Sequence, residues 1–122
     1  MTLQITTAEL EIMKVIWKSP GSGASEVTDA LTGKQDWSSK TVKTLLSRLV
    51  EKGALETQAE GRRYLYRPLI AKKDYQKFEA RQFVDRLFGG KAAPLVAQLA
   101  DAEGLTDDDI EELEALLGRL KK

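Results

Sequence analysis

The sequence predicts a mainly α-helical protein with one small β-hairpin, and three observations carry this prediction. Apolar residues recur at spacings of three and four before residue 53 and after residue 71, which is the period of an amphipathic helix. Between residues 55 and 68 the period changes to two, which is typical of strands. Proline, glycine and serine separate the periodic segments and mark where elements end.

The composition excludes several kinds of chemistry. The chain has 122 residues, 42% hydrophobic and 31% charged, which suits one compact domain with a modest appendage. It contains no cysteine and no histidine, which removes disulfides, thiolate metal sites and the commonest general base. No apolar run approaches the ~20 residues that span a bilayer, and residues 1–5 lack the pattern of a signal peptide. We therefore expect a cytoplasmic protein with no cofactor, no metal and no direct membrane binding.

The first helix is predicted to begin after Thr6. Thr6 and Glu9 are spaced as a capping box, in which each side chain accepts a hydrogen bond from the other residue's backbone amide. The helix ends at the breaker cluster of residues 19–23. Its apolar face is expected to consist of Leu10, Met13, Ile16 and Trp17.

A second, shorter helix is expected from Ala24 to Leu31. Thr32 and Gly33 end it, because glycine is the usual residue after a helix C-terminus. Residues 34–37 then form a connector with room for a short strand.

The third helix is capped by Ser38 or Ser39, runs to about Lys52 and ends at Gly53. One face is apolar, and it comprises Val42, Leu45, Leu46, Leu49 and Val50. The opposite face carries short hydroxyl and cationic side chains, with no acidic residue until Glu51. A solvated helix more often mixes both signs of charge, so this face indicates an anionic partner.

A hairpin follows the third helix. Residues 55–59 and 64–68 are predicted strands, joined through residues 60–63 so that the tip carries Arg62 and Arg63. Three helices followed by a two-stranded hairpin form the winged helix-turn-helix arrangement, in which the third helix enters the DNA major groove. The residues predicted to face DNA are Ser39, Lys40, Thr41, Lys43, Thr44, Ser47, Arg48, Arg62, Arg63 and Tyr64.

The distribution of charge supports this prediction, although the net charge is zero. Between Lys34 and Lys73 there are ten basic residues and four acidic ones. From Gln76 onward there are seven basic residues and ten acidic ones. The middle of the chain therefore suits nucleic acid, and the acidic end does not.

The C-terminal segment is predicted to hold a helix over residues 72–88, a short helix after Pro94 and a last helix capped by Thr106 and Asp109. Helices this short cannot fully cover one another's apolar stripes, so we expect a twofold partner copy to bury them. The stripe comprises Leu95, Val96, Leu99, Ile110, Leu113, Leu116, Leu117 and Leu120. The alternative is that the stripe folds back on the N-terminal domain.

Two other classes of function stay open from the residues alone. An enzyme would depend on carboxylates or lysines, and the one dense acidic group, Asp107 to Asp109, lies where it stabilises a helix N-terminus. A metal site there is disfavoured because consecutive helical residues point in different directions. A winged helix that binds protein in place of DNA would need an apolar or acidic third-helix face, and this one is basic.

Strings from both halves of the chain are characteristic of one protein family. They are Thr7-Ala8-Glu9, Val15-Ile16-Trp17, Trp37-Ser38, Thr41 to Leu49, Lys52 to Leu55, Gly61-Arg62 to Tyr66, and Leu105-Thr106 to Leu117. On these residues the chain resembles the BlaI/MecI/CopY family of penicillinase-type repressors over nearly its whole length.

The resemblance implies a winged-helix DNA-binding domain over residues 1–71 and a helical dimerisation domain over residues 72–122. It implies a transcriptional repressor, without catalytic activity, that binds inverted-repeat operators as a homodimer. On this chain, Thr41 and Thr44 would touch bases and the cations would mainly contact phosphates. Arg62 and Arg63 would lie on the flanking backbone or minor groove.

The chain departs from the family in the features that release these repressors from DNA. The copper-responsive branch carries a C-terminal cysteine hook, which a chain without cysteine cannot form. The β-lactam-responsive branch is cleaved by a membrane sensor protease at an Asn-Phe bond, and Gln98-Leu99 stands at that position here. A sensor protease therefore stays open as a partner, and the sequence predicts neither the inducer nor the operator.

Overall fold

The computed structural model describes residues 3–121. Residues 1, 2 and 122 lie outside that range. All three belong to the predicted domains, and residues 1 and 2 also belong to the segment that lacks the pattern of a signal peptide. The chain divides into two compact units, Met1–Tyr75 and Gln76–Lys122.

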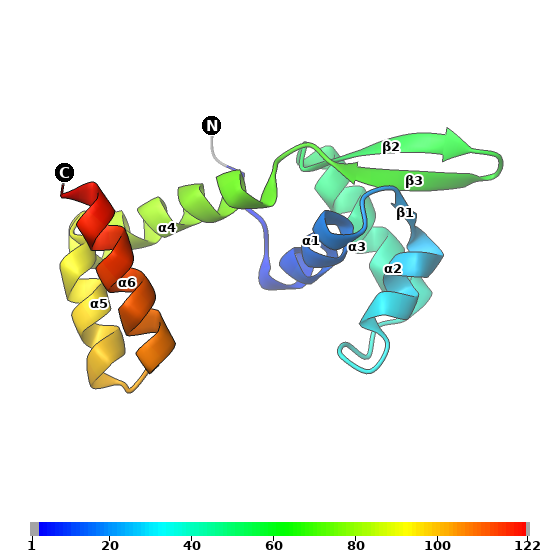
Figure 1. Ribbon diagram of the computed structural model, residues 1–122. Helices are drawn as coiled ribbons and strands as arrows, with labels where there is room; N and C mark the ends of the chain where they lie inside the picture. Colours follow the sequence, from blue (N-terminus) through cyan, green and yellow to red (C-terminus); the bar gives the residue numbers. More distant parts are fainter. Residues whose placement is uncertain (1–2, 122) are drawn as a thin grey trace. The chain divides into compact units, whose positions relative to one another are not determined.

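The first unit holds α1 (Thr7–Lys18), α2 (Ala24–Leu31) and α3 (Ser39–Glu51), which lie together beside a small sheet (Figure 1). The predicted mainly α fold with a β-hairpin wing is confirmed. One apolar core joins these elements, because each helix presents one apolar face to the others. It consists of Ile12, Met13, Ile16, Val27, Leu31, Val42, Leu45, Leu46, Leu49, Ala54 and Leu55.

Helix α1 begins at the predicted capping box: the Thr6 amide donates to Glu9 Oε1 (2.9 Å) and the Glu9 amide donates to Thr6 Oγ1 (3.1 Å). Its buried face differs from the predicted one. Ile12 is fully buried, whereas Leu10 and Trp17 are only partly buried. The reason is that α1 packs against α2, α3 and β3 at once, which centres its buried face on Ile12.

The sheet has three antiparallel strands in the order β1-β3-β2. Strands β2 (Leu55–Glu60) and β3 (Arg63–Pro68) form the hairpin, whose tip extends beyond the helices in Figure 1. The third strand, β1 (Ser22–Gly23), pairs with β3. The short strand therefore lies within the breaker cluster and not at residues 34–37, because Gly21 adopts a positive φ of 87° and its amide donates to the Tyr66 carbonyl (2.9 Å).

Trp17 ties the end of the hairpin to the first turn of α4 (Lys72–Phe88). Its indole Nε1 donates to the Ile70 carbonyl (2.9 Å), and its ring lies 5.6 Å from the ring of buried Tyr75. The first turn of α4 therefore packs in the first unit, which ends at Tyr75.

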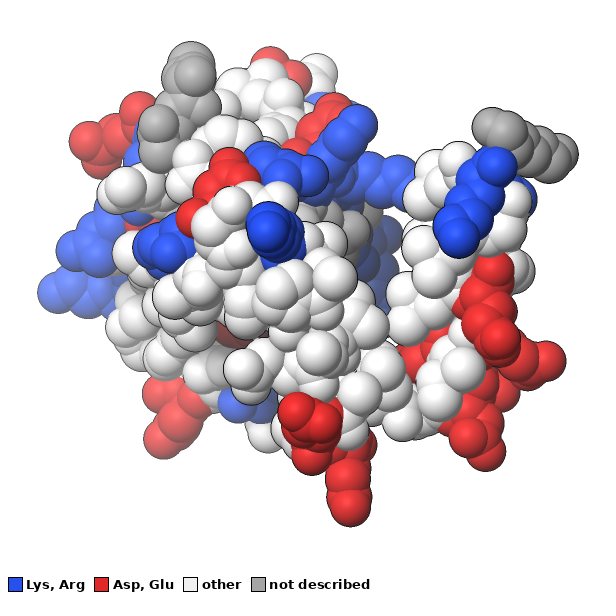
Figure 2. Space-filling model, turned by 90° about the vertical axis from the view of Figure 1, so that its left-hand side faces the viewer, with Lys and Arg blue, Asp and Glu red and all other residues white. Residues whose placement is uncertain are grey.

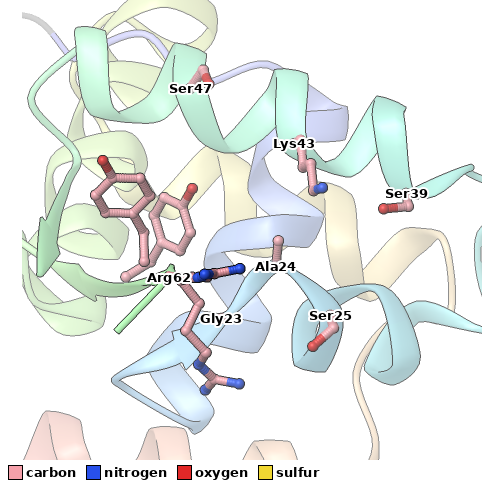
Figure 3. A pocket seen from close by; sticks show the side chains of 10 residues that line it. Gly23, Ala24, Ser25, Ser39, Lys43, Ser47 and Arg62 are labelled. Carbon is pink, nitrogen blue, oxygen red and sulfur yellow. The ribbon is translucent and has the colours of Figure 1, made fainter. Parts of the chain in front are cut away.

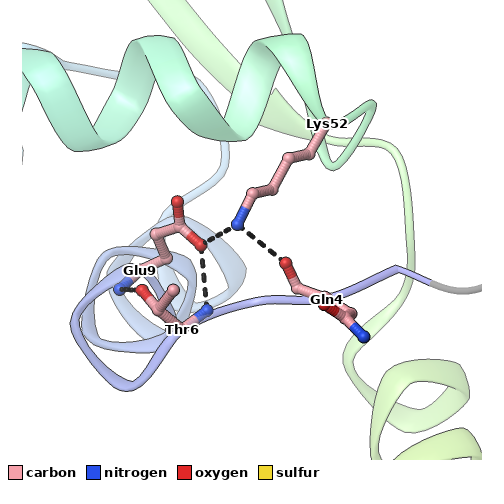
Figure 4. Close-up of polar contacts among 4 residues, drawn as sticks. All are labelled: Gln4, Thr6, Glu9 and Lys52. Carbon is pink, nitrogen blue, oxygen red and sulfur yellow. Dashed lines mark hydrogen bonds and ion pairs between the residues drawn. The ribbon is translucent and has the colours of Figure 1, made fainter.

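An ion pair with one buried partner joins the first and third helices. Lys52, at the C-terminal end of α3, donates from Nζ to Glu9 Oε1 (2.5 Å) and to the Gln4 carbonyl (2.8 Å), as Figure 4 shows. The Glu9 carboxylate is only 1% exposed. Burial raises the pKa of Glu9, but the hydrogen bonds from Lys52 and the Thr6 amide outweigh burial and hold it below the usual value.

The second unit contains the rest of α4, together with α5 (Ala92–Asp101) and α6 (Asp107–Leu120). Gly89 and Gly90 end α4 with positive φ, as the sequence predicts. The predicted cap of α6 is confirmed: Thr106 Oγ1 accepts from the Asp109 amide (3.0 Å), and the Thr106 amide donates to the Asp109 carboxylate (3.1 Å). Helix α5 begins before Pro94, because an amide in the first helical turn has no intrahelical partner to lose.

Within residues 3–121, no helix is long and apolar enough to cross a membrane. The same residues contain no group of three or more carboxylates placed to hold a metal ion.

We predict that replacing Glu9 with glutamine lowers the free energy of unfolding by about 2–3 kcal/mol near neutral pH, measured by urea denaturation. Breaking a fully buried pair costs more, but Lys52 is 32% exposed and water can solvate part of the freed ammonium. The Glu11→Gln variant is the matched control, because Glu11 pairs with Lys14 at the surface (3.2 Å) and such helical pairs contribute about 0.5 kcal/mol or less.

The same pair predicts loss of stability in acid. Because the pKa of Glu9 lies lower in the folded chain than its usual value of 4.5, the stabilisation is present above about pH 4.5 and is lost as the pH falls through the folded-state pKa. Urea denaturation along a descending pH series should show a shallower acid loss for Glu9→Gln than for the unmodified protein. Equal acid losses would contradict this role of Glu9.

Candidate nucleic-acid interface

The orientation of α3 is fixed by the apolar face that it buries. Val42, Leu46 and Leu49 have no exposed surface, and Leu45 is 6% exposed. The Ser38 hydroxyl caps the helix by accepting from the Thr41 amide (3.2 Å). Rotation of α3 would expose this stripe, so the opposite face must point away from the core.

The opposite face of α3 carries every α3 residue that the sequence predicts to face DNA. All seven are exposed: Ser39, Lys40, Thr41, Lys43, Thr44, Ser47 and Arg48. No acidic side chain lies in the first turn of the helix. The face therefore offers cations and short hydroxyls at the surface, which are the groups that bind phosphates and base edges.

A groove of about 480 Å³ lies between this face, the start of α2 and the hairpin (Figure 3). Lys43 projects from α3 toward the hairpin, and Arg62 approaches from the other side. The groove is lined by Gly23, Ala24, Ser25, Ser39, Lys43, Ser47, Arg62, Arg63, Tyr64 and Tyr66. Six of the ten predicted DNA-facing residues thus meet in one concave surface.

A second, shallow depression of about 510 Å³ follows α3 itself. Ser39, Lys43 and Ser47 line both hollows, and Lys40 and Thr44 are added in the second. The remaining two predicted residues, Thr41 and Arg48, line neither hollow. At about 100° per residue they lie on the flank of α3 that is turned away from the hairpin.

The hydroxyls of the two predicted base-contacting threonines already have partners. Thr44 Oγ1 donates to the Lys40 carbonyl (3.0 Å), and the Thr41 and Ser38 hydroxyls lie 3.2 Å apart. Because the Thr44 proton is held by the backbone, its oxygen is left to act as an acceptor. That oxygen can accept from the amino group of adenine or cytosine in the major groove.

The hairpin turns through two residues, Gly61 and Arg62, because Glu60 pairs with Arg63. Gly61 has a φ of 64°, and glycine at the first central position is what a type II′ turn requires. Tyr64 is 59% exposed beside this turn. Tyr66, two residues on, is partly buried, and burial raises the pKa of its phenol.

Two cations counted in the basic middle of the chain are held by carboxylates. Lys52 turns inward to Glu9, and Arg63 Nη1 donates to Glu26 Oε2 (3.0 Å). Sequence analysis missed Glu26, although its spacing of three residues from Gly23 is that of a helix cap. Glu26 Oε1 indeed accepts from the Gly23 amide (2.7 Å). Counting charges along the sequence therefore overstates the free positive charge of the interface.

In the second unit, all eight predicted dimerisation residues retain exposed surface. Leu95 and Leu113 are partly buried, and the exposed ones are Val96, Leu99, Ile110, Leu116, Leu117 and Leu120. A groove of about 600 Å³ between α5 and α6 is lined by four of them, Val96, Leu99, Leu113 and Leu116. The view in Figure 2 shows broad uncharged areas next to clusters of acidic side chains.

Comparisons with known proteins place this architecture among repressors. A sequence model of the penicillinase repressor family matches residues 5–119. The chain is 39% identical to the penicillinase repressor of Bacillus licheniformis, over 93% of this chain and 89% of that one. It is 30% identical to the methicillin resistance regulatory protein MecI of Staphylococcus aureus strain N315, over 97% of this chain and 96% of that one.

Two similar solved structures each cover about three fifths of the chain. The solution structure of the DNA-binding domain of the repressor BlaI has a TM-score of 0.54 and 48% identity, covering 60% of this chain and 89% of that chain. The Bacillus licheniformis BlaI monomer in complex with the blaP half-operator has a TM-score of 0.52 and 49% identity, covering 59% of this chain and 88% of that chain.

We predict that replacing Gly61 with alanine destabilises the hairpin by about 1–2 kcal/mol, because an L-residue resists the left-handed conformation. The measurement is thermal denaturation together with the cross-strand contacts between Ala59 and Tyr64 by nuclear magnetic resonance. Arg62→Ala is the matched control in the same turn, because Arg62 does not have a positive φ. Equal stability of the two variants would contradict the proposed turn geometry.

Proposed function

Because the chain belongs to the penicillinase repressor family, a family of transcriptional repressors and not of enzymes, we propose that it represses transcription by binding operator DNA. This activity requires access to DNA in the cytoplasm. The observation that carries the proposal is the uninterrupted face of cations and hydroxyls on α3, which opens into the groove shared with the hairpin.

We propose that α3 lies in the major groove, which is wide enough to admit a helix. Lys40, Lys43 and Arg48 contact phosphates along the edges of the DNA major groove and hold the helix in register. Thr41 and Thr44 contact bases, supported for Thr44 by the acceptor that its hydroxyl keeps free. Ser39 and Ser47 line the same surface and complete the polar contact.

The hairpin then lies along the neighbouring backbone. Arg62 occupies the turn and lines the groove opposite Lys43, so its guanidinium is directed toward the surface that DNA would cover. Among the described residues, no carboxylate pairs with Arg62. We propose that Arg62 binds a flanking phosphate, with exposed Tyr64 beside it.

We propose that the protein is a homodimer on inverted-repeat sites. Neither α5 nor α6 has a buried residue, and among residues 76–121 only Val84 of α4 is buried. A twofold partner would cover the exposed leucines, and twofold protein symmetry matches dyad symmetry in the operator.

A membrane sensor protease is the remaining proposed partner. The Gln98–Leu99 bond lies within α5, where the Gln98 carbonyl accepts from the Ala102 amide (3.1 Å) and the Leu99 carbonyl accepts from the Gly104 amide (2.7 Å). Cleavage at this bond therefore requires local opening of the end of α5.

The proposed function is tested by selecting fragments of genomic DNA with the purified full-length protein at moderate salt. We expect enrichment of a dyad-symmetric site near promoters. Affinity should fall as salt rises, and Lys43→Met should reduce the slope of log affinity against log salt by about 0.9 per protomer. Lys14→Met is the control, because Lys14 pairs with Glu11 on α1 and should leave the slope unchanged.

The proposed function would be contradicted by a folded protein that enriches no DNA site and whose binding to DNA does not depend on salt. That outcome would favour a winged helix that binds another protein.

The dimer is tested separately by sedimentation. We predict that Leu113→Asp combined with Leu116→Asp yields monomers, since each change would bury a charge in the proposed interface. Glu111→Gln is the control, because Glu111 is exposed on α6. A dimer that persists at micromolar concentration in the double variant would place the interface elsewhere.

A further inference from the structure

Glu26 makes two contacts that join the start of α2 to the hairpin. Its Oε1 accepts from the Gly23 amide (2.7 Å), which caps the helix, and its Oε2 accepts from Arg63 Nη1 (3.0 Å). Strand β1 lies beside β3, with Gly23 opposite Leu65, and this pairing brings residues 23, 26 and 63 together. The carboxylate therefore bridges two elements that both line the groove.

The carboxylate of Glu26 lies close to the backbone at Gly23. A Cβ there would lie 2.7 Å from Glu26 Oε1 and 3.4 Å from Arg63 Cζ. A side chain at this position would therefore shift the end of the Glu26 side chain, whereas the Arg63 guanidinium would stay at ordinary van der Waals distance. The observed position of the carboxylate thus fits a glycine at position 23.

The charge of Arg63 is consequently compensated where the other groove cations are not. Hydrogen bonds from the Gly23 amide and from Arg63 hold the pKa of Glu26 below its usual value, so the carboxylate stays ionised at neutral pH. The side chains of Arg63 and Glu26 are 48% and 47% exposed, and pairs this exposed add little to stability. The main effect of the pair is to compensate the positive charge of Arg63 at the groove.

We propose that Glu26 holds Arg63 away from the DNA backbone, so that Arg62 alone makes the phosphate contact of the hairpin. The inference deepens the proposed function and rests on it. The Glu26–Arg63 pair carries no net charge, and a phosphate that drew Arg63 away would meet the carboxylate left behind. In this proposal Glu26 sets the number of phosphates that the protein neutralises, and Arg63, which the sequence predicts to face DNA, contacts Glu26 in place of a phosphate.

The test is the salt dependence of binding by the full-length protein to a short duplex of arbitrary sequence. Because each neutralised phosphate contributes about 0.9 to the log–log slope, Arg62→Met should lower the slope by that amount per protomer. Arg63→Met alone would leave the Glu26 carboxylate uncompensated beside the DNA, so the role of Arg63 is tested in the Glu26→Gln background. Glu26→Gln should raise the slope by about 0.9 and tighten binding about fivefold at ~0.15 M salt, because it frees Arg63.

The double variant Glu26→Gln/Arg63→Met separates the two roles of Glu26. Glutamine keeps an oxygen that can accept from the Gly23 amide, so the cap of α2 is retained and thermal denaturation should be unchanged. Without Arg63 to free, the double variant should return to the slope of the unmodified protein. A double variant as steep as Glu26→Gln would show that Arg63 does not carry the effect, and would overturn the inference.

A double variant whose slope falls as far below that of the unmodified protein as the slope of Arg62→Met would also overturn it, since Arg63 would then bind a phosphate in the unmodified protein. A different outcome would contradict the proposed function itself. If the unmodified protein binds the duplex without any salt dependence, both the DNA-binding role and this inference are wrong.

Discussion

The structure of the first unit depends on the burial of one face of α3. Val42, Leu46 and Leu49 are closed off from water between α1, α2 and the hairpin, and turning the helix would expose all three. This constraint presents Lys40, Lys43 and Ser47 to solvent. The ion pair between Lys52 and buried Glu9 adds a fixed point at the end of α3. The core thus determines what the surface can bind.

The hairpin supplies the second wall of the same surface, and its position follows from backbone geometry. Gly21 lets β1 run alongside β3, and Gly61 allows the two-residue turn that carries Arg62. Cations in the hairpin are therefore not equivalent. Arg62 is at the turn, whereas Arg63 is one residue further on and reaches Glu26. Both side chains line the same groove, and the ion pair with Glu26 is what distinguishes them.

The two units manage their apolar residues differently. The first buries eleven of them in one core. In the second, α5 and α6 leave Val96, Leu99 and Leu116 partly in water. Such a surface is costly for an isolated chain but is suited to association with a copy of itself. In the proposed repressor, the first unit would bind DNA and a second copy would cover the exposed apolar residues of the second unit.

The sequence by itself determined the order of the helices and the two hairpin strands, both capping boxes with threonine and the exposed face of α3, because periodicity and capping are local properties that short-range spacing encodes. It also carried the family resemblance, which the comparisons confirm. It did not place β1, centre the buried face of α1 on Ile12, or separate Arg62 from Arg63. Tertiary structure decided these features, because strand pairing and ion pairs such as Glu26–Arg63 join residues that lie far apart in the chain.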